Sequence, residues 1–297
     1  MDDGNIPCLF VRGKCLPEAW EKAILEVWEN GIDVRTEYDR KNASGEFIDP
    51  PSKDATVIIE VIEPFSEPRI HKNFPGGPSE LEIYRQEVVK GIHDHWVNPL
   101  DKEKWTYTYH GRLFDYTATE DLENPSSSKL QPVNQMEYIV DKLCETHYTR
   151  RAQAITWMPN ADVKLEDPPC LQRLWFRLVK DNSGTLTLNL NTHWRSRDAY
   201  KAWFMNAFAM TDLQKKIAER ISKKINKPVK TGRYVDISDS LHIYGSYFKE
   251  FRPEFEKIKS DPDFSKRAFD SDHPAMKMLF EETREKLKND PDFMLSK

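Results

Sequence analysis

Cys170 is the residue with the clearest potential for nucleophilic chemistry. It follows two prolines in the segment DPPC and stands immediately before an apolar stretch that is typical of a strand. Prolines restrict the backbone and remove two N–H donors, so the thiol would be presented from a rigid strand entry. A free cysteine is also a common core residue, and both interpretations stay open on this feature alone. Cys8, Cys15 and Cys144 have nothing comparable beside them.

Two arginine-containing segments could bind an anion. Arg195 and Ser196 lie between an apolar stretch and a long predicted helix, where a cation, a hydroxyl and free helix N–H groups would attract a phosphate. Alternatively, Ser196 is only the N-cap of that helix, with Asp198 in its first turn. Arg150 and Arg151 are adjacent, and guanidinium groups bind phosphate in a bidentate manner, although such pairs on an acidic chain are usually just solvated.

Further polar side chains stand in apolar surroundings. Asn206 lies on or beside the apolar stripe of the long helix, and its amide could read the edge of a pyrimidine ring or simply satisfy a packing neighbour. His242 and Tyr244 alternate with apolar residues in SLHIYG, so both would point to one face of an extended segment. The HDH run at 93–95 lacks the spacing of a HExxH helix or a zinc ribbon, so we expect a surface turn and no metal site.

The hydrophobic pattern indicates the elements that would position these residues. Helices are predicted at 17–30, with Gly31 as the C′ residue, and at 79–92, 133–146 and 198–224, with two amphipathic helices near the end of the chain. Strands are predicted at 5–12, 55–62, 152–157, 171–179, 185–194 and 233–238, and loops at 32–54 and 124–132. No repeat or composition break forces a boundary, so we expect one α/β (α+β) domain over 1–297.

Composition excludes several classes of protein. The 297 residues are 38% hydrophobic and 31% charged, which is enough apolar material for a sizeable core. The net charge of −5 gives no positive excess with which to coat a nucleic acid polymer. Neither a run of 18 apolar residues nor a secretory signal is found, so no membrane partner is expected. Because the four cysteines form no CxxC pair, a reducing, cytoplasmic location is predicted.

Taken in chain order, these pieces resemble the motifs of the thymidylate synthase family. The ordered set is RRAQAITW at 150–157, PC at 169–170, RSRD at 195–198, Asn206, and HIY at 242–244. The resemblance covers about residues 84–247 and leaves a divergent N-terminal portion of about 80 residues. It implies a mixed twisted sheet packed with helices, and a homodimer joined sheet to sheet.

The resemblance also implies a reaction. The Cys170 thiolate would add to C6 of dUMP, and C5 would then capture the methylene group of 5,10-methylenetetrahydrofolate, or of a methanopterin-type equivalent, to give dTMP. The alternative is 5-hydroxymethylation of dUMP or dCMP, with water in place of hydride. A non-catalytic nucleotide-binding protein is a third interpretation. The family uses no metal, and its partner in each case is a pyrimidine nucleotide.

The family's site roles carry over residue by residue. By this match, Arg195 would stabilise the thiolate and bind the phosphate, together with Ser196. Asn206 would bind the base, and His242 and Tyr244 would bind the sugar. Arg150 and Arg151 would reach the phosphate from the other subunit. Asp198 would hold the pterin, and Tyr109 would organise proton transfer at C5. Glu87 is our choice for the carboxylate that acts through water, with Glu80 and Glu82 on the same predicted helix as alternatives.

Several positions depart from the family pattern. Leu171 follows the cysteine where histidine is usual, and Trp194 precedes Arg195 where glutamine is usual. The segment 49–56 replaces an Asp-Arg-x-Gly-Thr phosphate loop, so its arginine is missing and Lys53 is the nearest cation. The end of the chain, DPDFMLSK, lacks the family's apolar tail. These departures point to a divergent branch, nearer the archaeal-type synthases and the nucleotide hydroxymethylases.

Overall fold

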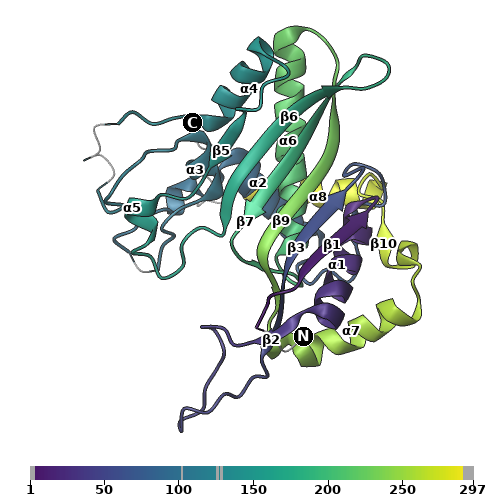
Figure 1. The fold of residues 1–297 in the computed structure, drawn as a ribbon. Coiled ribbons are helices and arrows are strands. Elements are labelled where there is room, and N and C mark those ends of the chain that lie inside the picture. The colour runs from purple at the N-terminus through teal and green to yellow at the C-terminus, as the bar shows by residue number, and fades with distance from the viewer. Residues whose placement is uncertain (1–3, 102, 125–126, 128–129, 290–297) are drawn as a thin grey trace.

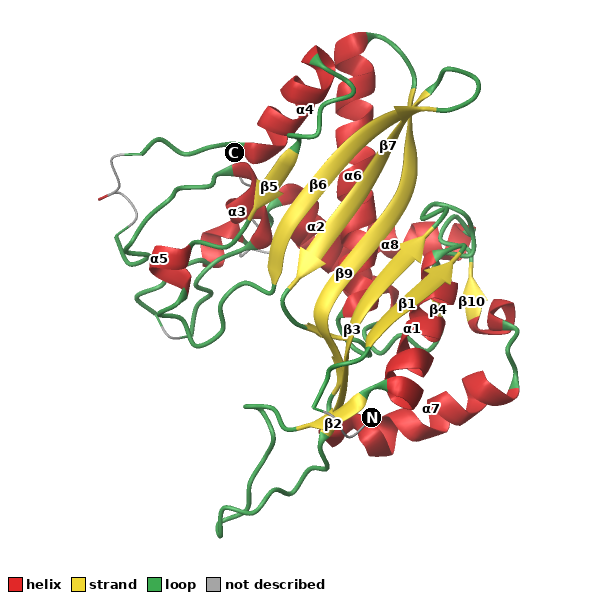
Figure 2. Cartoon of the chain, in the orientation of Figure 1, coloured by secondary structure: helices red, strands yellow, loops and turns green. Residues whose placement is uncertain are grey.

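An eight-stranded mixed sheet forms the centre of the molecule (Figures 1 and 2). The computed structural model describes residues 4–101, 103–124, 127 and 130–289. The sheet is ordered β1-β3-β9-β7-β6-β5, with β2 paired to β3 and β8 paired to β9. Its strands are β1 (Cys8–Gly13), β2 (Ile32–Val34), β3 (Ser52–Val61), β5 (Gln153–Ile155), β6 (Leu171–Lys180), β7 (Leu186–Trp194), β8 (Arg197–Asp198) and β9 (Val229–Ile243). Short strands β4 (Ile70–His71) and β10 (Ala268–Phe269) pair separately.

Helices cover one face of this sheet, and much of the opposite face is left open by the described residues (Figures 1 and 2). The helices are α1 (Leu16–Asn30), α2 (Gly77–Lys90), α3 (Tyr109–Phe114), α4 (Gln135–Glu145), α5 (Pro159–Asp162), α6 (Trp203–Ile225), α7 (Phe248–Ser260) and α8 (Pro274–Asn289). The long helix α6 runs behind the strands, and α1 lies beside it. The mixed sheet packed with helices agrees with the predicted fold class.

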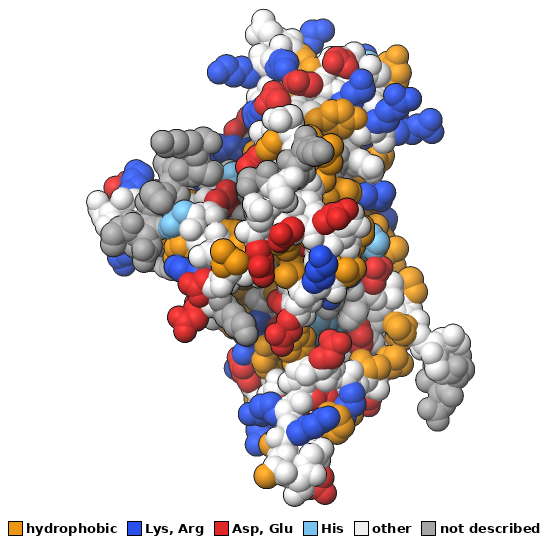
Figure 3. All heavy atoms as spheres, turned by 90° about the vertical axis from the view of Figure 1, so that its left-hand side faces the viewer, with side chains coloured by type: hydrophobic (Ala, Val, Ile, Leu, Met, Phe, Trp, Pro, Cys, Tyr) orange, Lys and Arg blue, Asp and Glu red, His pale blue; other side chains and the backbone are white. Residues whose placement is uncertain are grey.

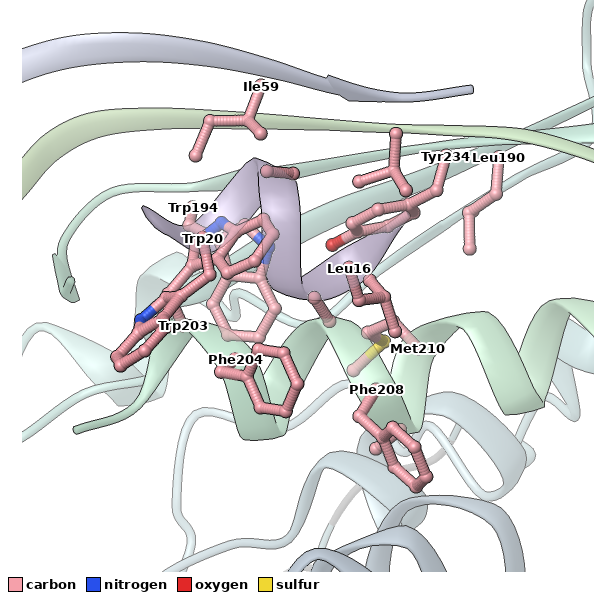
Figure 4. Packing of buried hydrophobic residues seen from close by; sticks show 14 of the residues in the cluster. Leu16, Trp20, Ile59, Leu190, Trp194, Trp203, Phe204, Phe208, Met210 and Tyr234 are labelled. Atoms are coloured by element: carbon pink, nitrogen blue, oxygen red, sulfur yellow. The ribbon is translucent and has the colours of Figure 1, made fainter. Parts of the chain in front are cut away.

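The core lies between the sheet and helices α1 and α6. Alternate residues of β3, such as Val57 and Ile59, are fully buried, as a strand with one covered face requires. Figure 4 shows Trp20 of α1 close to Phe204 of α6 beneath the sheet, with ring centroids 5.8 Å apart. Trp20 Nε1 donates to the carbonyl of Ala199 at 2.8 Å. Packing of α1 therefore also holds the chain segment that follows β8.

The predicted elements are largely confirmed, with four corrections at their ends. Residues 32–54 are not all loop, because β2 and the start of β3 lie within them. The strand predicted at 233–238 extends over all of β9. Helix α1 ends before Gly31, but the φ of that glycine is −72°, so it is not a left-handed C′ residue.

The fourth correction bears on the site. Helix α6 begins at Trp203 rather than at 198, and Ala202 is its N-cap. The Asp198 carboxylate accepts from the backbone N–H groups of Tyr200 and Lys201 at 2.8 and 2.9 Å, which holds a turn between β8 and α6. The interpretation of Ser196 as the N-cap of this helix is therefore wrong, and Asp198 is not in its first turn.

Charged side chains of both signs are interspersed on the face that carries α3 and α5 (Figure 3). This mixture fits the small net charge of the sequence. Within the described part of the chain, no helix combines the length and apolar composition needed to cross a membrane.

Candidate active site

A cavity of about 640 Å³ lies where the entry to β6 meets the ends of β7, β8 and β9. We call it the Cys170 cavity. Its lining includes eight residues that were predicted from the sequence: Tyr109, Cys170, Arg195, Ser196, Asp198, Asn206, His242 and Tyr244. These residues come from well-separated segments of the chain, so their meeting in one cavity is a property of the fold rather than of local spacing.

A second cavity of about 330 Å³ adjoins the first, and Tyr109 and Asp167 line both. We call it the Glu87 cavity, because Glu87 of α2 is on its wall together with Tyr84 and Trp105. The other two candidate carboxylates lie elsewhere. Glu80 is exposed, and Glu82 is buried in ion pairs with Arg85 and Arg284. Of the three carboxylates, Glu87 alone is among the described residues that line these two cavities.

Arg195 holds the segment that presents the cysteine. Its backbone N–H donates to the Cys170 carbonyl at 2.9 Å, and its guanidinium donates to the carbonyls of Pro168 at 2.6 Å and Pro169 at 3.2 Å. Burial raises the pKa of the Cys170 thiol, while the positive charges of Arg195 and Arg197 act in the opposite direction. Desolvation is the larger of these effects, so the two arginines act against the burial of the thiol, and the role of Arg195 at the thiolate stays a prediction.

Arg197 is a buried cation that the sequence-based prediction missed. It forms an ion pair with the buried Asp236 at 2.8 Å and lies over the ring of Trp194, with its Cζ 3.5 Å from the ring centroid. Tyr234 and Ser238 also donate to the Asp236 carboxylate, at 2.8 and 2.9 Å. A sequence signal was present: Tyr234, Asp236 and Ser238 alternate on one strand face, and a carboxylate on a buried face requires a cation.

Asn206 is placed on the cavity wall by the long helix. It is 7% exposed, and its Nδ2 donates to the hydroxyl of Tyr84 at 2.7 Å. Tyr84 belongs to α2, so this hydrogen bond joins two helices at the site. No feature of the sequence singled out Tyr84, because its partner is 122 residues away.

His242 and Tyr244 point to the same region, as their alternation predicts. Their ring centroids are 4.5 Å apart in an edge-to-face arrangement. Asp54 of β3 lies opposite His242 in the sheet register, and Ser240 donates to Asp54 at 2.9 Å and contacts His242 Nδ1 at 3.3 Å. Burial lowers the pKa of His242 to about 4, so the imidazole is neutral at pH 7.

Arg35 is a further cation on the Cys170 cavity that the sequence-based prediction missed. It lies in the chain between β2 and β3 and donates to the carbonyl of Asp49 at 2.6 Å. Lys53, expected as the nearest cation, instead pairs with Asp33 at 2.9 Å and is not among the residues that line this cavity. Of these two cations, Arg35 rather than Lys53 therefore lines the Cys170 cavity.

Arg150 and Arg151 are exposed, and neither is among the described residues that line the two cavities. The carbonyl of Arg150 accepts from Trp175 Nε1 at 3.0 Å, which places this pair beside β6. Within one chain, these arginines are therefore separate from the cavity that holds Cys170.

The HDH run at 93–95 is not the expected surface turn. His93 is 8% exposed, and Asp94–Trp96 form a single 3-10 turn. His93 Nδ1 is 2.8 Å from Glu87 Oε1, and His110 Nδ1 is 2.6 Å from Asp94 Oδ2. Within the described ranges, no group of three or more His, Cys, Asp and Glu side chains is arranged to hold a metal ion.

Comparisons with known proteins agree on one family. The sequence model described as "Thymidylate synthase" matches residues 77–286. The chain is 27% identical over 255 residues to a "Putative thymidylate synthase" of Methanocaldococcus jannaschii, covering 83% of this chain and 97% of that protein. It is 28% identical over 235 residues to a protein of the same name from Methanosarcina acetivorans, covering 79% and 89%.

A solved structure supports the fold. The thermostable thymidylate synthase A from Bacillus subtilis aligns with a TM-score of 0.53 and 17% sequence identity, over 82% of this chain and 84% of that chain. The family model covers most of the chain, so this protein belongs to the thymidylate synthase family. The early resemblance is thereby confirmed, and its departures agree with the archaeal origin of these relatives.

Proposed function

We propose that this protein is a one-carbon transferase that converts dUMP to dTMP with a methylene-carrying reduced folate, or its methanopterin-type equivalent, as co-substrate. The observation that carries the proposal is the Cys170 cavity, where a cysteine, an amide and a neutral imidazole with an adjacent tyrosine meet beside arginines. Family membership supports the reaction class, and the cavity supports the assignment of a role to each residue.

The chemistry begins at the thiol. The Cys170 thiolate forms a bond to C6 of the uracil ring, the C5–C6 double bond breaks, and its electron pair moves toward O4. Because burial raises the pKa of the thiol, Arg195 and Arg197 must favour the thiolate, and a hydrogen-bond donor at O4 must stabilise the negative charge that develops there. Asn206, on the wall of the same cavity, is assigned to donate to O4 and to accept from N3–H.

The second half is transfer of one carbon. The activated C5 bonds to the methylene carbon as the bond from that carbon to one pterin nitrogen breaks. The C5 proton then leaves through water to Glu87, with Tyr109 on the walls of both cavities, and the second carbon–nitrogen bond breaks. A hydride then adds to the methylene carbon, the C5–C6 double bond re-forms and the Cys170 thiolate leaves C6. The reduced pterin supplies the methylene carbon and a hydride and leaves as the dihydro form. Asp198, on the wall of the Cys170 cavity, is assigned to the pterin, and Arg195, Ser196 and Arg35 to the phosphate.

The first prediction tests the nucleophile. Incubation with 5-fluoro-dUMP and methylenetetrahydrofolate should give a stable covalent adduct at Cys170, because fluorine cannot leave as the C5 proton does. Intact-mass analysis with peptide mapping locates the adduct. Cys170→Ala should abolish it while still binding nucleotide, and the matched variant Cys144→Ala, which changes a cysteine outside the cavities, should retain it. An adduct at another residue, or none in the wild type, contradicts the proposal.

Product analysis separates the two one-carbon reactions. Methyl transfer oxidises the folate, so dihydrofolate absorbance should rise in step with dTMP. A product 16 mass units heavier than dTMP, formed without dihydrofolate, would be the hydroxymethyl nucleotide and would replace methylation by the alternative. Nucleotide binding with no covalent chemistry would leave only the binding-protein interpretation.

A further inference from the structure

Glu87 and His93 form a close carboxylate–imidazole pair at the edge of the Glu87 cavity. Their Oε1 and Nδ1 atoms are 2.8 Å apart, and both side chains are largely buried. The pair forms because α2 ends at Gly91, whose φ of +63° turns the chain so that His93 returns beside the last turn of the helix. The contact is therefore built into the helix end.

Aromatic rings hold the imidazole in place. The His93 ring stacks on Trp96 with centroids 3.8 Å apart and an interplanar angle of 10°, and Trp105 meets it edge-on at 5.6 Å. The adjacent Asp94 pairs with His110 and accepts from Thr108 at 2.5 Å. Because Asp94 is already engaged, the His93 imidazole is paired with Glu87 rather than with its sequence neighbour.

Glu87 is also tuned by its surroundings. Burial raises the pKa of its carboxyl group to about 7, close to the value that suits a general base near neutral pH. The other titratable or charged groups on this cavity are Tyr84, Lys104, Tyr107, Tyr109, His110 and Asp167. Of the helices packed against α2, α3 presents His110, which pairs with Asp94, α6 presents Asp212, which pairs with Arg85, and α8 presents Arg284, which pairs with Glu82.

We propose that His93 is the positioning residue for Glu87 and that the two side chains act as one proton-accepting dyad. The imidazole N–H donates to Oε1 and leaves Oε2 for the water that collects the C5 proton. When the C5–H bond breaks, its electron pair forms a double bond to the methylene carbon as the pterin leaves, and the proton passes through that water to Oε2 of Glu87 while His93 keeps its N–H on Oε1. This inference rests on the proposed function and adds a residue that the family motifs do not include.

The test uses two variants with different chemistry. His93→Gln keeps an amide donor but cannot take a proton, and His93→Phe keeps the stacked ring but removes the donor. We expect kcat to fall by about tenfold to a hundredfold while the KM for dUMP stays within about threefold. The acidic limb of the kcat–pH profile should move to higher pH in His93→Phe, because a carboxylate that loses a donor is harder to ionise. His93→Gln should move it less.

Two controls separate this inference from the proposed function and from misfolding. Adduct formation with 5-fluoro-dUMP stops before proton removal, so both variants should still form the Cys170 adduct. His71→Gln removes another buried imidazole–carboxylate pair, 2.6 Å from Glu21 and outside both cavities, and should keep the wild-type pH profile. If both His93 variants keep kcat within about threefold of the wild type and the acidic limb of the profile does not move, the dyad is overturned while the proposed function stands. Absence of the adduct in the wild type would overturn the proposed function and the dyad with it.

Discussion

At the scale of single residues, base recognition depends on how the Asn206 amide is oriented. One Nδ2 hydrogen is used by the Tyr84 hydroxyl, which leaves the second hydrogen for O4 of uracil and the carbonyl oxygen for N3–H. Cytosine presents the opposite pattern, with a 4-amino donor and an N3 acceptor. A mismatch in a buried site costs about 1–3 kcal/mol, or roughly one to two powers of ten.

The wild type should therefore prefer dUMP over dCMP in kcat/KM by at least about tenfold. Asn206→Asp should reduce or reverse this preference, because a carboxylate accepts from the 4-amino group. Tyr84→Phe should weaken it as well, because the amide would lose the hydroxyl that holds its orientation. If Asn206→Asp lowers kcat/KM equally for dUMP and dCMP, Asn206 is a packing residue that does not read the base.

The buried His242 should make the free energy of unfolding depend on pH in the acidic range. Its pKa is about 4 in the folded protein and 6.5 in a model peptide, so between these values the unfolded chain binds the extra proton. The contribution of His242 to stability should be constant above pH 6.5 and should be lost as the pH drops toward 4, by up to about 3 kcal/mol. Denaturant unfolding at several pH values should show that His242→Gln loses this part of the acid dependence. His273→Gln, at an exposed site, should follow the wild type.

At the scale of elements, the end of α2 shapes the candidate dyad. A methyl group on Gly91 would collide with His110 and Asp94, and its φ of +63° is unfavourable for alanine. Gly91→Ala should therefore destabilise the protein by at least about 2 kcal/mol and also lower kcat by displacing His93. Gly184→Ala, at φ +82° in the β6–β7 hairpin with nothing within 4 Å, should cost only the backbone strain of about 1–2 kcal/mol. Urea unfolding of both variants measures the two losses of stability. Equal losses would contradict the inferred collision at Gly91.

The helices and strands were predicted well where the sequence has a clear hydrophobic pattern, as in β6, or a glycine that ends a helix, as in α2. The start of α6 was misjudged because Asp198 looks like a first-turn acid, while in the fold β8 pairs with β9 and delays the helix to Trp203. The candidate site was predicted through an ordered set of motifs. Arg35 and Tyr84 were missed because their placement on the cavity walls depends on long-range contacts that spacing along the chain does not encode. Asp236 on a buried strand face indicated that a cation was needed, but not that Arg197 would supply it.

At the scale of the whole molecule, the open face of the sheet carries apolar side chains between polar ones. Phe10 is exposed, and Trp175, Val235 and Ile237 are only partly covered, on the side opposite the buried Tyr234. Arg150 joins this face through Trp175. We propose that a second copy packs here and brings Arg150 and Arg151 to the phosphate end of its partner's Cys170 cavity. Each chain would then be one catalytic domain whose site is completed by the other.

The last prediction follows from that sharing. A chain with Arg151→Ala keeps its cysteine, and a chain with Cys170→Ala keeps its arginine. A hybrid dimer of the two has one site with both residues intact and one site with neither. Random exchange makes about half of the dimers hybrids, so mixing should restore about a quarter of wild-type turnover from two nearly inactive parents. Mixing Arg151→Ala with the double variant Arg151→Ala/Cys170→Ala should restore none. A fully active monomer in sedimentation, or no recovery after verified subunit exchange, would show that each chain carries a complete site and that the exposed arginines serve another purpose.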